Sequence, residues 1–172
     1  MKDPYLLLKP RGATVGGEVE VRRDFRQGWM LAAQYSAQHS RYLNGSSPSD
    51  LFGSSNPDFR HVPNAPEHLA AVRGSVPVIS HALVASTRIA IEGPRFDRHD
   101  QASDPEAQGK TDGAVIWDLV FSGQEPKWGL RYAVGVYNAF DWRYTAPLSA
   151  EFRQTALVQN GRTFMASVNV AF

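Results

Sequence analysis

The chain of 172 residues contains no cysteine. It can therefore have no disulfide framework, no cysteine-ligated zinc site and no cysteine nucleophile. Charge of one sign is also scarce, because 18 Lys and Arg residues against 17 Asp and Glu residues leave a formal net charge of +1. With no run of five or six like charges, nothing in the sequence predicts a nucleic-acid partner.

Long hydrophobic runs are missing as well. No stretch approaches the roughly 18 apolar residues of a membrane-spanning helix, and the start of the chain has only a short apolar patch, Tyr5 to Leu8. This start is therefore not expected to be a secretory signal peptide. A polar average composition usually indicates a soluble protein. Transmembrane β-barrels are the exception, because their strands alternate apolar and polar residues and so average to a polar composition.

Alternation with a period of two recurs seven times, whereas helical periodicity never lasts three turns. In the first such segment, Val15, Val19 and Val21 fall on one face, and Glu18 and Glu20 fall on the other. We therefore expect an all-β fold of about seven antiparallel strands, connected up and down. The expected strands lie near residues 14–23, 29–38, 67–76, 82–92, 113–122, 128–137 and 162–172.

The strand lengths and the connections indicate a transmembrane barrel. The strands are about 10 residues long, beyond the usual 5 to 6 and within the 9 to 11 that cross a bilayer at a tilt. Short turns alternate strictly with long loops, as periplasmic turns and extracellular loops do in such barrels. Large aromatic residues also gather at two levels, as in aromatic girdles. The lower level comprises Phe25, Trp29, Phe121, Trp128 and Phe172, and the upper level comprises Tyr35, Phe140, Trp142 and Phe164.

A soluble antiparallel sandwich or small barrel shows the same alternation, with its apolar face turned inward. Alternation by itself therefore leaves open whether the apolar face meets lipid or a protein core. The alternative is a self-contained small β-barrel, either an eight-stranded outer-membrane protein or a lipocalin-like binder. Strand length, loop asymmetry and the aromatic levels favour the membrane barrel over a soluble one.

Several short motifs resemble those of TonB-dependent outer-membrane receptors. The segment Val136–Tyr144 resembles the family's "V-x-N-L-F-D-x-x-Y", with Ala139 in place of the usual Leu. Residues 161–172 are similar to its closing strand, "G-R-x-F-x-x-x-x-x-x-x-F". Residues 16–29 resemble its "G-x-E-x-E … G-W" hairpin, and residues 64–68 resemble its "N-x-P-x-H". These motifs follow one another in the family's order.

The resemblance implies that residues 1–172 are the carboxyl-terminal segment of a receptor β-barrel, about a third of a barrel of roughly 22 strands. The plug domain and the TonB-contacting box are absent from it. The implied function is energised uptake of a scarce solute such as a ferric siderophore, in the bacterial outer membrane. Such a barrel breaks no bond, so we expect no enzyme activity and no cofactor. The implied partners are outer-membrane lipid, a metal chelate or similar solute, TonB through the missing plug region, and the barrel-assembly machinery through the terminal strand ending at Phe172.

Ligand-binding residues are expected in the three long loops, because loops on a rigid scaffold carry recognition. Arginine and aromatic side chains suit planar anionic ligands. The alternative for each residue is a solvated loop position or an interface anchor. No metal site is expected, since His99 has no second histidine at ligand spacing. The candidates are Arg60 and His61 in the first loop, Arg98 and His99 in the second, and Trp142, Arg143 and Tyr144 in the third.

A second set of charged residues falls opposite the apolar positions and is expected to face the barrel lumen. There the charges would pair across strands or contact a plug, which favours a structural role over ligand binding. On the lipid face, each Arg would cost roughly 2 to 4 kcal/mol at the bilayer midplane. The residues expected to face the lumen are Glu18, Glu20, Arg73, Arg88, Asp118 and Arg131.

Overall fold

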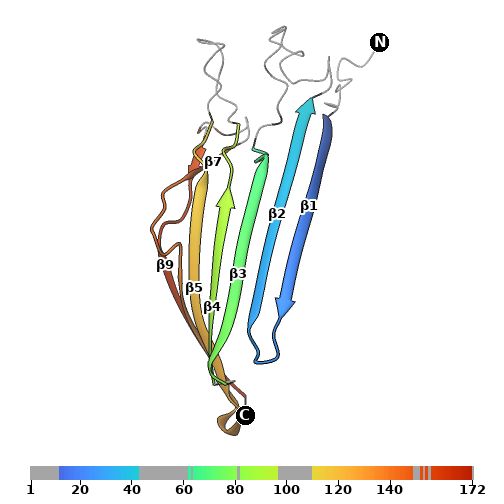
Figure 1. The fold of residues 1–172 in the computed structure, drawn as a ribbon. Coiled ribbons are helices and arrows are strands. Elements are labelled where there is room, and N and C mark those ends of the chain that lie inside the picture. Colours follow the sequence, from blue (N-terminus) through green and yellow to red (C-terminus); the bar gives the residue numbers. More distant parts are fainter. Residues whose placement is uncertain are drawn as a thin grey trace, which may run out of the picture.

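The computed structural model describes residues 12–42, 62, 64–80, 82–96, 110–148, 152, 154 and 156–171. Its main element is a seven-stranded antiparallel sheet in the order β1-β2-β3-β4-β5-β6-β9 (Figure 1). The strands are β1 (Gly12–Asp24), β2 (Met30–Tyr42), β3 (His68–Ile79), β4 (Leu83–Glu92), β5 (Ala114–Glu125), β6 (Leu130–Tyr137) and β9 (Thr163–Val170). The predicted all-β, up-and-down fold of seven strands is confirmed.

Strand ends differ from the prediction where glycine and proline suggested a turn. Residues Pro77–Ile79 complete β3, and the register shifts between Pro77 and Ile79. Such an irregularity accommodates a proline, which has no N–H to donate to the neighbouring strand. Residues Gly123–Glu125 complete β5, where Gly123 pairs with Tyr132 of β6. Pairing with the next strand therefore overrides the local turn preference.

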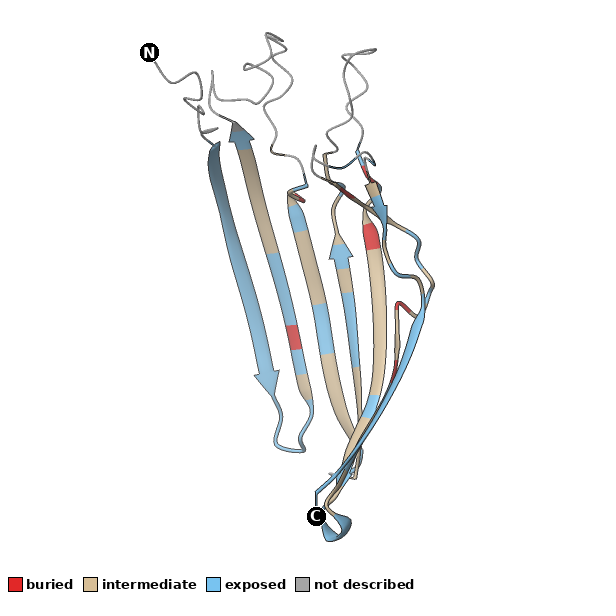
Figure 2. Ribbon diagram, turned by 180° about the vertical axis from the view of Figure 1, so that it is seen from behind, coloured by how far each residue is buried: buried red, intermediate tan, exposed pale blue. Residues whose placement is uncertain are grey.

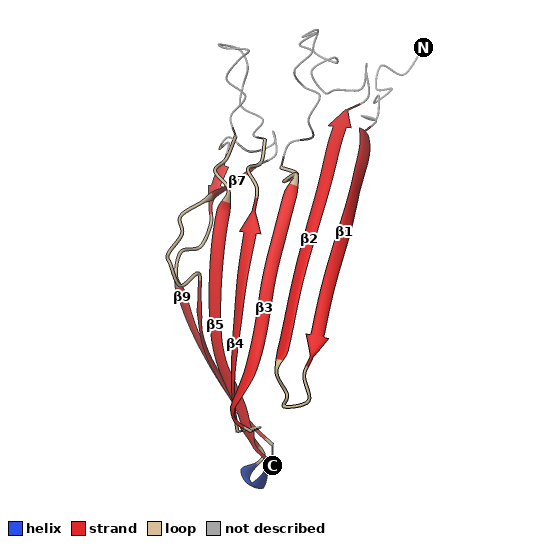
Figure 3. Cartoon of the chain, viewed as in Figure 1, coloured by secondary structure: helices blue, strands red, loops and turns tan. Residues whose placement is uncertain are grey.

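The third long loop contains structure that the alternation did not predict. Strands β7 (Thr145–Pro147) and β8 (Ala156–Val158) form a separate two-stranded antiparallel sheet. Three-residue strands are too short to show a period of two. The short 3-10 helix η2 (Pro126–Trp128) occupies the turn before β6, so Trp128 precedes that strand rather than beginning it. Strands make up most of the described chain (Figure 3).

The short turns lie together at one end of the sheet (Figure 1). In the turn between β1 and β2, the backbone N–H of Phe25 donates to the carbonyl of Trp29 at 2.8 Å. In the turn between β5 and β6, the Glu125 side chain accepts from the backbone N–H of Lys127. The opposite end, where β2 ends and β3 begins, is called the loop end below.

Strand register places the apolar positions of all seven strands on one side of the sheet. For example, Val72 pairs with Ala33 and with Ile89, and Ile89 pairs with Trp117. Directly paired residues point to the same side of the sheet, and successive residues along a strand point to opposite sides. Alternate pairs along the strands therefore form an apolar face, and the pairs between them form a polar face. The apolar face includes Val15, Val19, Val21, Leu31, Tyr35, Val72, Ile89, Ile91, Trp117, Leu119, Phe121, Val134, Val136, Phe164 and Val168.

The sheet is a single layer without a hydrophobic core. Among the described residues, prolines apart, the only buried hydrophobic side chains are those of Ala32 and Ala114, and buried positions are few along the ribbon (Figure 2). Among the described residues, no further strand or helix packs on the apolar face. Monomeric soluble proteins rarely expose a large contiguous apolar surface, and such a surface marks a site of contact with protein or lipid.

Both edges of the sheet are open within the described chain. Strand β1 pairs only with β2, and β9 pairs only with β6. The self-contained closed barrel that the sequence left as an alternative is therefore not the structure formed by these residues. No described helix combines the length and the apolar character needed to span a membrane.

Candidate functional site

The structure describes the predicted ligand-binding residues of the third loop only. Trp142, Arg143 and Tyr144 follow β6 directly and are described. The remaining candidates, Arg60, His61, Arg98 and His99, lie outside the described residues, as does Phe172. The geometry of the site can therefore be built from the third loop and from the two faces of the sheet.

The base of the third loop is held by Asn138, the residue that follows β6. Its side chain is buried, with 5% of the residue exposed. Its Oδ1 accepts from the backbone N–H of Trp142 at 2.8 Å, and its Nδ2 donates to the carbonyls of Trp142 and Asn160 at 2.9 and 3.2 Å. Its own backbone N–H donates to the carboxylate of Asp118 at 3.0 Å. The Asn138 side chain thus joins both ends of the loop, and its backbone N–H connects them to β5.

Asp141 makes a second connection across the base of the loop. Its Oδ1 accepts from the backbone N–H of Arg162 at 2.8 Å, and Arg162 Nε donates to the carbonyl of Ala139 at 3.0 Å. Gly161 lies directly against this carboxylate, because a Cβ there would stand 2.4 Å from Asp141 Oδ1. We call Asn138, Asp141 and Arg162 the loop clasp.

The loop clasp explains why the motif contains these residue types. Asn138 and Asp141 adopt φ values of 51° and 54°, in the left-handed region that Asn and Asp tolerate better than other side chains. The ring of Phe140 packs on Trp117 with centroids 5.0 Å apart. Sequence reasoning used Asn138 and Asp141 only for the resemblance and missed their structural role. Their position between a strand and a polar loop could have indicated this role, because Asn and Asp side chains often hydrogen bond to the backbone of a turn.

The clasp presents the three candidate residues on a fixed backbone. Both backbone polar groups of Trp142 are bonded to Asn138. The carbonyl of Tyr144 accepts from the backbone N–H of Gln159 at 3.0 Å. The Arg143 side chain is 85% exposed, with its guanidinium 3.9 Å from the Asp141 carboxylate. A guanidinium and two aromatic rings on an ordered segment suit recognition of a planar anion, and this role stays a prediction.

The residues expected to face the lumen share the polar face of the sheet. Arg73 pairs directly with Arg88, and Arg88 pairs with Asp118. Arg73 also forms an ion pair with Glu20 of β1. This bridge crosses β2 at Ala32, the direct pairing partner of Arg73, which accounts for the 1% exposure of Ala32. Glu18 and Arg131 lie on the same face by register. That this face lines a lumen remains a prediction.

Three polar groups of aromatic side chains on the apolar face are hydrogen bonded within the protein. Trp117 Nε1 donates to Thr87 Oγ1 at 2.8 Å. The Tyr35 hydroxyl is hydrogen bonded to His68 Nδ1 at 2.8 Å, and the Tyr132 hydroxyl donates to the carbonyl of Ala82. An unpaired polar group costs several kcal/mol in hydrocarbon, so these bonds suit a face that is out of contact with water.

Comparison with known proteins gives structural matches only. No family model and no curated protein sequence matches the chain. The crystal structure of the ferric yersiniabactin uptake receptor FyuA from Yersinia pestis is similar, with a TM-score of 0.67 and 20% identity over 95% of this chain. A structure of P. aeruginosa FpvA bound to a heterologous pyoverdine and iron has a TM-score of 0.65 and 18% identity over 91% of this chain. The chain shares its fold with one part of these two proteins.

The matches cover 24% of FyuA and 19% of FpvA. The chain therefore spans about a quarter or less of the length of each. The likeness confirms, at the level of the fold, the receptor resemblance given by the motifs. FyuA is named as an uptake receptor, and neither protein is named as an enzyme. No group of three or more metal-ligating side chains occurs in the part of this chain that the structure describes.

Proposed function

We propose that the chain is one section of the barrel wall of a TonB-dependent receptor in the bacterial outer membrane. The whole receptor takes up a scarce solute such as a ferric siderophore. The observation that carries this proposal is the fold shared with FyuA over 95% of the chain. The FpvA complex, which contains pyoverdine and iron, supports a metal chelate as the class of solute.

The two faces of the sheet support the membrane placement. The apolar face carries exposed large side chains on every strand of the sheet, and the bonds of Trp117, Tyr35 and Tyr132 leave those polar groups satisfied. In lipid, every backbone polar group must also be paired, which a sheet achieves only by closing into a barrel. In this proposal, the free edges of β1 and β9 pair with further strands of the same receptor.

The remaining assignments follow from this placement. The polar face lines the lumen, and a plug domain outside these residues fills it and contacts TonB. Outer-membrane lipid covers the apolar face, and the barrel-assembly machinery recognises the terminal strand ending at Phe172. Trp142, Arg143 and Tyr144 contact the solute together with Arg60, His61, Arg98 and His99. The receptor performs no catalysis.

The test is uptake of radioactive iron from a panel of ferric siderophores by cells that carry or lack the gene. We expect one complex to be taken up only with the gene and with TonB. The double substitution of Trp142 and Arg143 by alanine is expected to weaken binding of that complex about tenfold, or roughly 1.4 kcal/mol. Lys127→Ala, which removes a cation at the short-turn end, is the control and is expected to change nothing. Uptake of every complex without the gene would contradict the proposal.

A further inference from the structure

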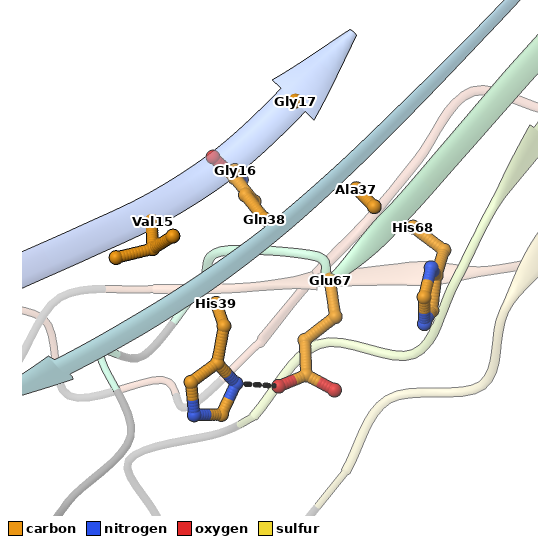
Figure 4. Close-up of a pocket in the computed structure, with 8 residues that line it drawn as sticks. All are labelled: Val15, Gly16, Gly17, Ala37, Gln38, His39, Glu67 and His68. Atoms are coloured by element: carbon orange, nitrogen blue, oxygen red, sulfur yellow. Dashed lines mark hydrogen bonds and ion pairs between the residues drawn. The ribbon is translucent and has the colours of Figure 1, made fainter.

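At the loop end, the segment that leads from the first long loop into β3 is bonded to β2. The backbone N–H of Val62 donates to the carbonyl of Ser40 at 3.2 Å. The backbone N–H of Gln38 donates to the carbonyl of Glu67 at 2.9 Å. The Glu67 carboxylate also meets the imidazole of His39, with Oε1 2.7 Å from Nδ1 (Figure 4). The end of the first loop is therefore anchored to β2.

Asn64 lies within this segment and is bonded to the start of the second long loop. Its backbone N–H donates to the carbonyl of Phe96 at 3.0 Å, and its Oδ1 accepts from Nη1 of Arg95 at 2.8 Å. Its φ of 59° lies in the left-handed region, which Asn adopts at a lower cost than most other side chains. The backbone and the side chain of Asn64 thus both link the first loop to the second.

Arg95 makes bonds to three parts of the loop end. Besides the bond to Asn64, its Nη2 donates to Oε2 of Glu92, the last residue of β4, at 2.6 Å. Its backbone N–H donates to Oγ1 of Thr111 at 3.1 Å, and its carbonyl accepts from the backbone N–H of Thr111 at 2.9 Å. Thr111 comes from the far end of the second loop and is 8% exposed. We call Asn64, Glu92, Arg95 and Thr111 the loop joint.

The loop joint differs from the loop clasp because it connects two loops rather than the two ends of one. Two of the predicted ligand-binding residues lie close to it along the chain. His61 comes three residues before Asn64, and Arg98 comes three residues after Arg95. Three residues span at most about 11 Å. The position of the loop joint therefore limits where these two residues can lie relative to each other.

We propose that Arg95 is a positioning residue that makes the first and second loops a single binding unit for the solute. Its guanidinium is bonded to Asn64 and Glu92 and does not contact the solute itself. Through these bonds and the backbone bonds to Thr111, it sets the distance between the two loops. Loops already held in their binding arrangement lose less conformational freedom on binding, which strengthens binding. The binding step rests on the proposed function, whereas the connection between the loops rests on the geometry of the loop joint.

The first test is the mobility of a spin label on Val62→Cys, measured by electron paramagnetic resonance on the whole receptor in lipid vesicles. Arg95→Met changes the second loop and is expected to make this first-loop label more mobile, because it removes the side-chain bonds to Asn64 and Glu92. Asn64→Gly removes the bond to Arg95 from the other side and keeps the positive φ without strain. It is expected to have the same effect on the label.

Two controls separate a connection between loops from a general loss of order. Arg23→Met removes a guanidinium at the short-turn end, where it lies 5.0 Å from the centroid of the Phe25 ring, and should leave the Val62→Cys label unchanged. A label on Arg143→Cys reports the third loop, which the loop clasp holds. It should keep its mobility in Arg95→Met.

The second test is uptake of radioactive iron bound to each siderophore of the panel described above. For the complex that is taken up, Arg95→Met is expected to raise the concentration for half-maximal uptake about tenfold and to leave the maximal rate unchanged. Arg23→Met should change neither quantity. The double variant Asn64→Gly/Arg95→Met should be no worse than Arg95→Met alone, because both substitutions remove the same bond.

Unchanged mobility of the Val62→Cys label in both Arg95→Met and Asn64→Gly would overturn this inference. An equal rise in the mobility of the Arg143→Cys label would also overturn it, as would a lower maximal rate of uptake at an unchanged half-maximal concentration. If none of the complexes is taken up by cells with the unaltered receptor, the proposed function fails. The label on Val62→Cys then still decides whether Arg95 joins the two loops.

Discussion

Ile89→Arg is expected to prevent assembly of the protein in the outer membrane. Ile89 lies at the centre of the apolar face, between Val72 and Trp117, and is 41% exposed. An arginine that faces lipid near the midplane costs roughly 2 to 4 kcal/mol, a large fraction of the stability of a protein domain. The measurement is the amount of folded protein in outer membranes, detected as a compact band that is lost on boiling.

Two control substitutions on the polar face of β4 distinguish the effect of a charge on the apolar face from the effect of any change in this strand. Ala90→Arg introduces the same charge one residue along, on the polar face between Ala71 and Ile116, and is expected to assemble. Arg88→Leu removes a charge from the polar face and is also expected to assemble. Equal amounts of folded Ile89→Arg and Ala90→Arg protein would show that the apolar face does not meet lipid.

Asn138→Ala is expected to lower the free energy of unfolding by about 3 kcal/mol. The substitution leaves the backbone N–H and carbonyl of Trp142 without their partner, together with the carbonyl of Asn160. Each unsatisfied buried group costs about 1 to 3 kcal/mol, which local rearrangement and water reduce. Alanine at a φ of 51° adds about 1 kcal/mol of backbone strain. Urea unfolding of the receptor in lipid vesicles measures the change.

Asn138→Gly is the control that separates these causes. Glycine adopts a positive φ without strain but makes none of the side-chain hydrogen bonds, so we expect a loss of about 2 kcal/mol. Asn169→Ala on the exposed polar face is expected to change stability by less than about 0.5 kcal/mol. A spin label on Arg143→Cys reports the loop itself and should become more mobile in both Asn138 variants. Unchanged stability and unchanged label mobility in Asn138→Ala would show that the clasp does not hold the loop.

The strands and their faces were predictable because a period of two is a local property. Each segment, such as residues 113–122, carries its own alternation, and pairing only had to bring like faces together. Strand ends were predicted less well, because glycine and proline favour turns unless a neighbouring strand provides pairing. The pairing of Gly123 with Tyr132 and the register shift at Pro77 depend on β6 and β4, which the local sequence does not show.

The loop clasp could not be predicted from residue spacing. Asn138 bonds to Asp118 and Asn160, which lie 20 and 22 residues away in the sequence. The pairing of Gly17 with Ala37 likewise depends on strand register, since a shift of one residue would move one of them to the other face. Among the predicted ligand-binding residues, the structure describes the third-loop group, whose backbone is bonded to Asn138 of the clasp.

Single-cysteine labelling along β5 tests the central claim most directly, since the chain contains no cysteine of its own. Cysteines are introduced one at a time between Val115 and Ser122 and treated with a membrane-impermeant maleimide in outer membranes. If the sheet is a barrel wall, labelling alternates with a period of two. We predict labelling at Asp118, Val120 and Ser122, and protection by lipid at Val115, Trp117, Leu119 and Phe121. Uniform labelling, or labelling of the second set alone, would contradict a wall with lipid on its apolar face and water on its polar face.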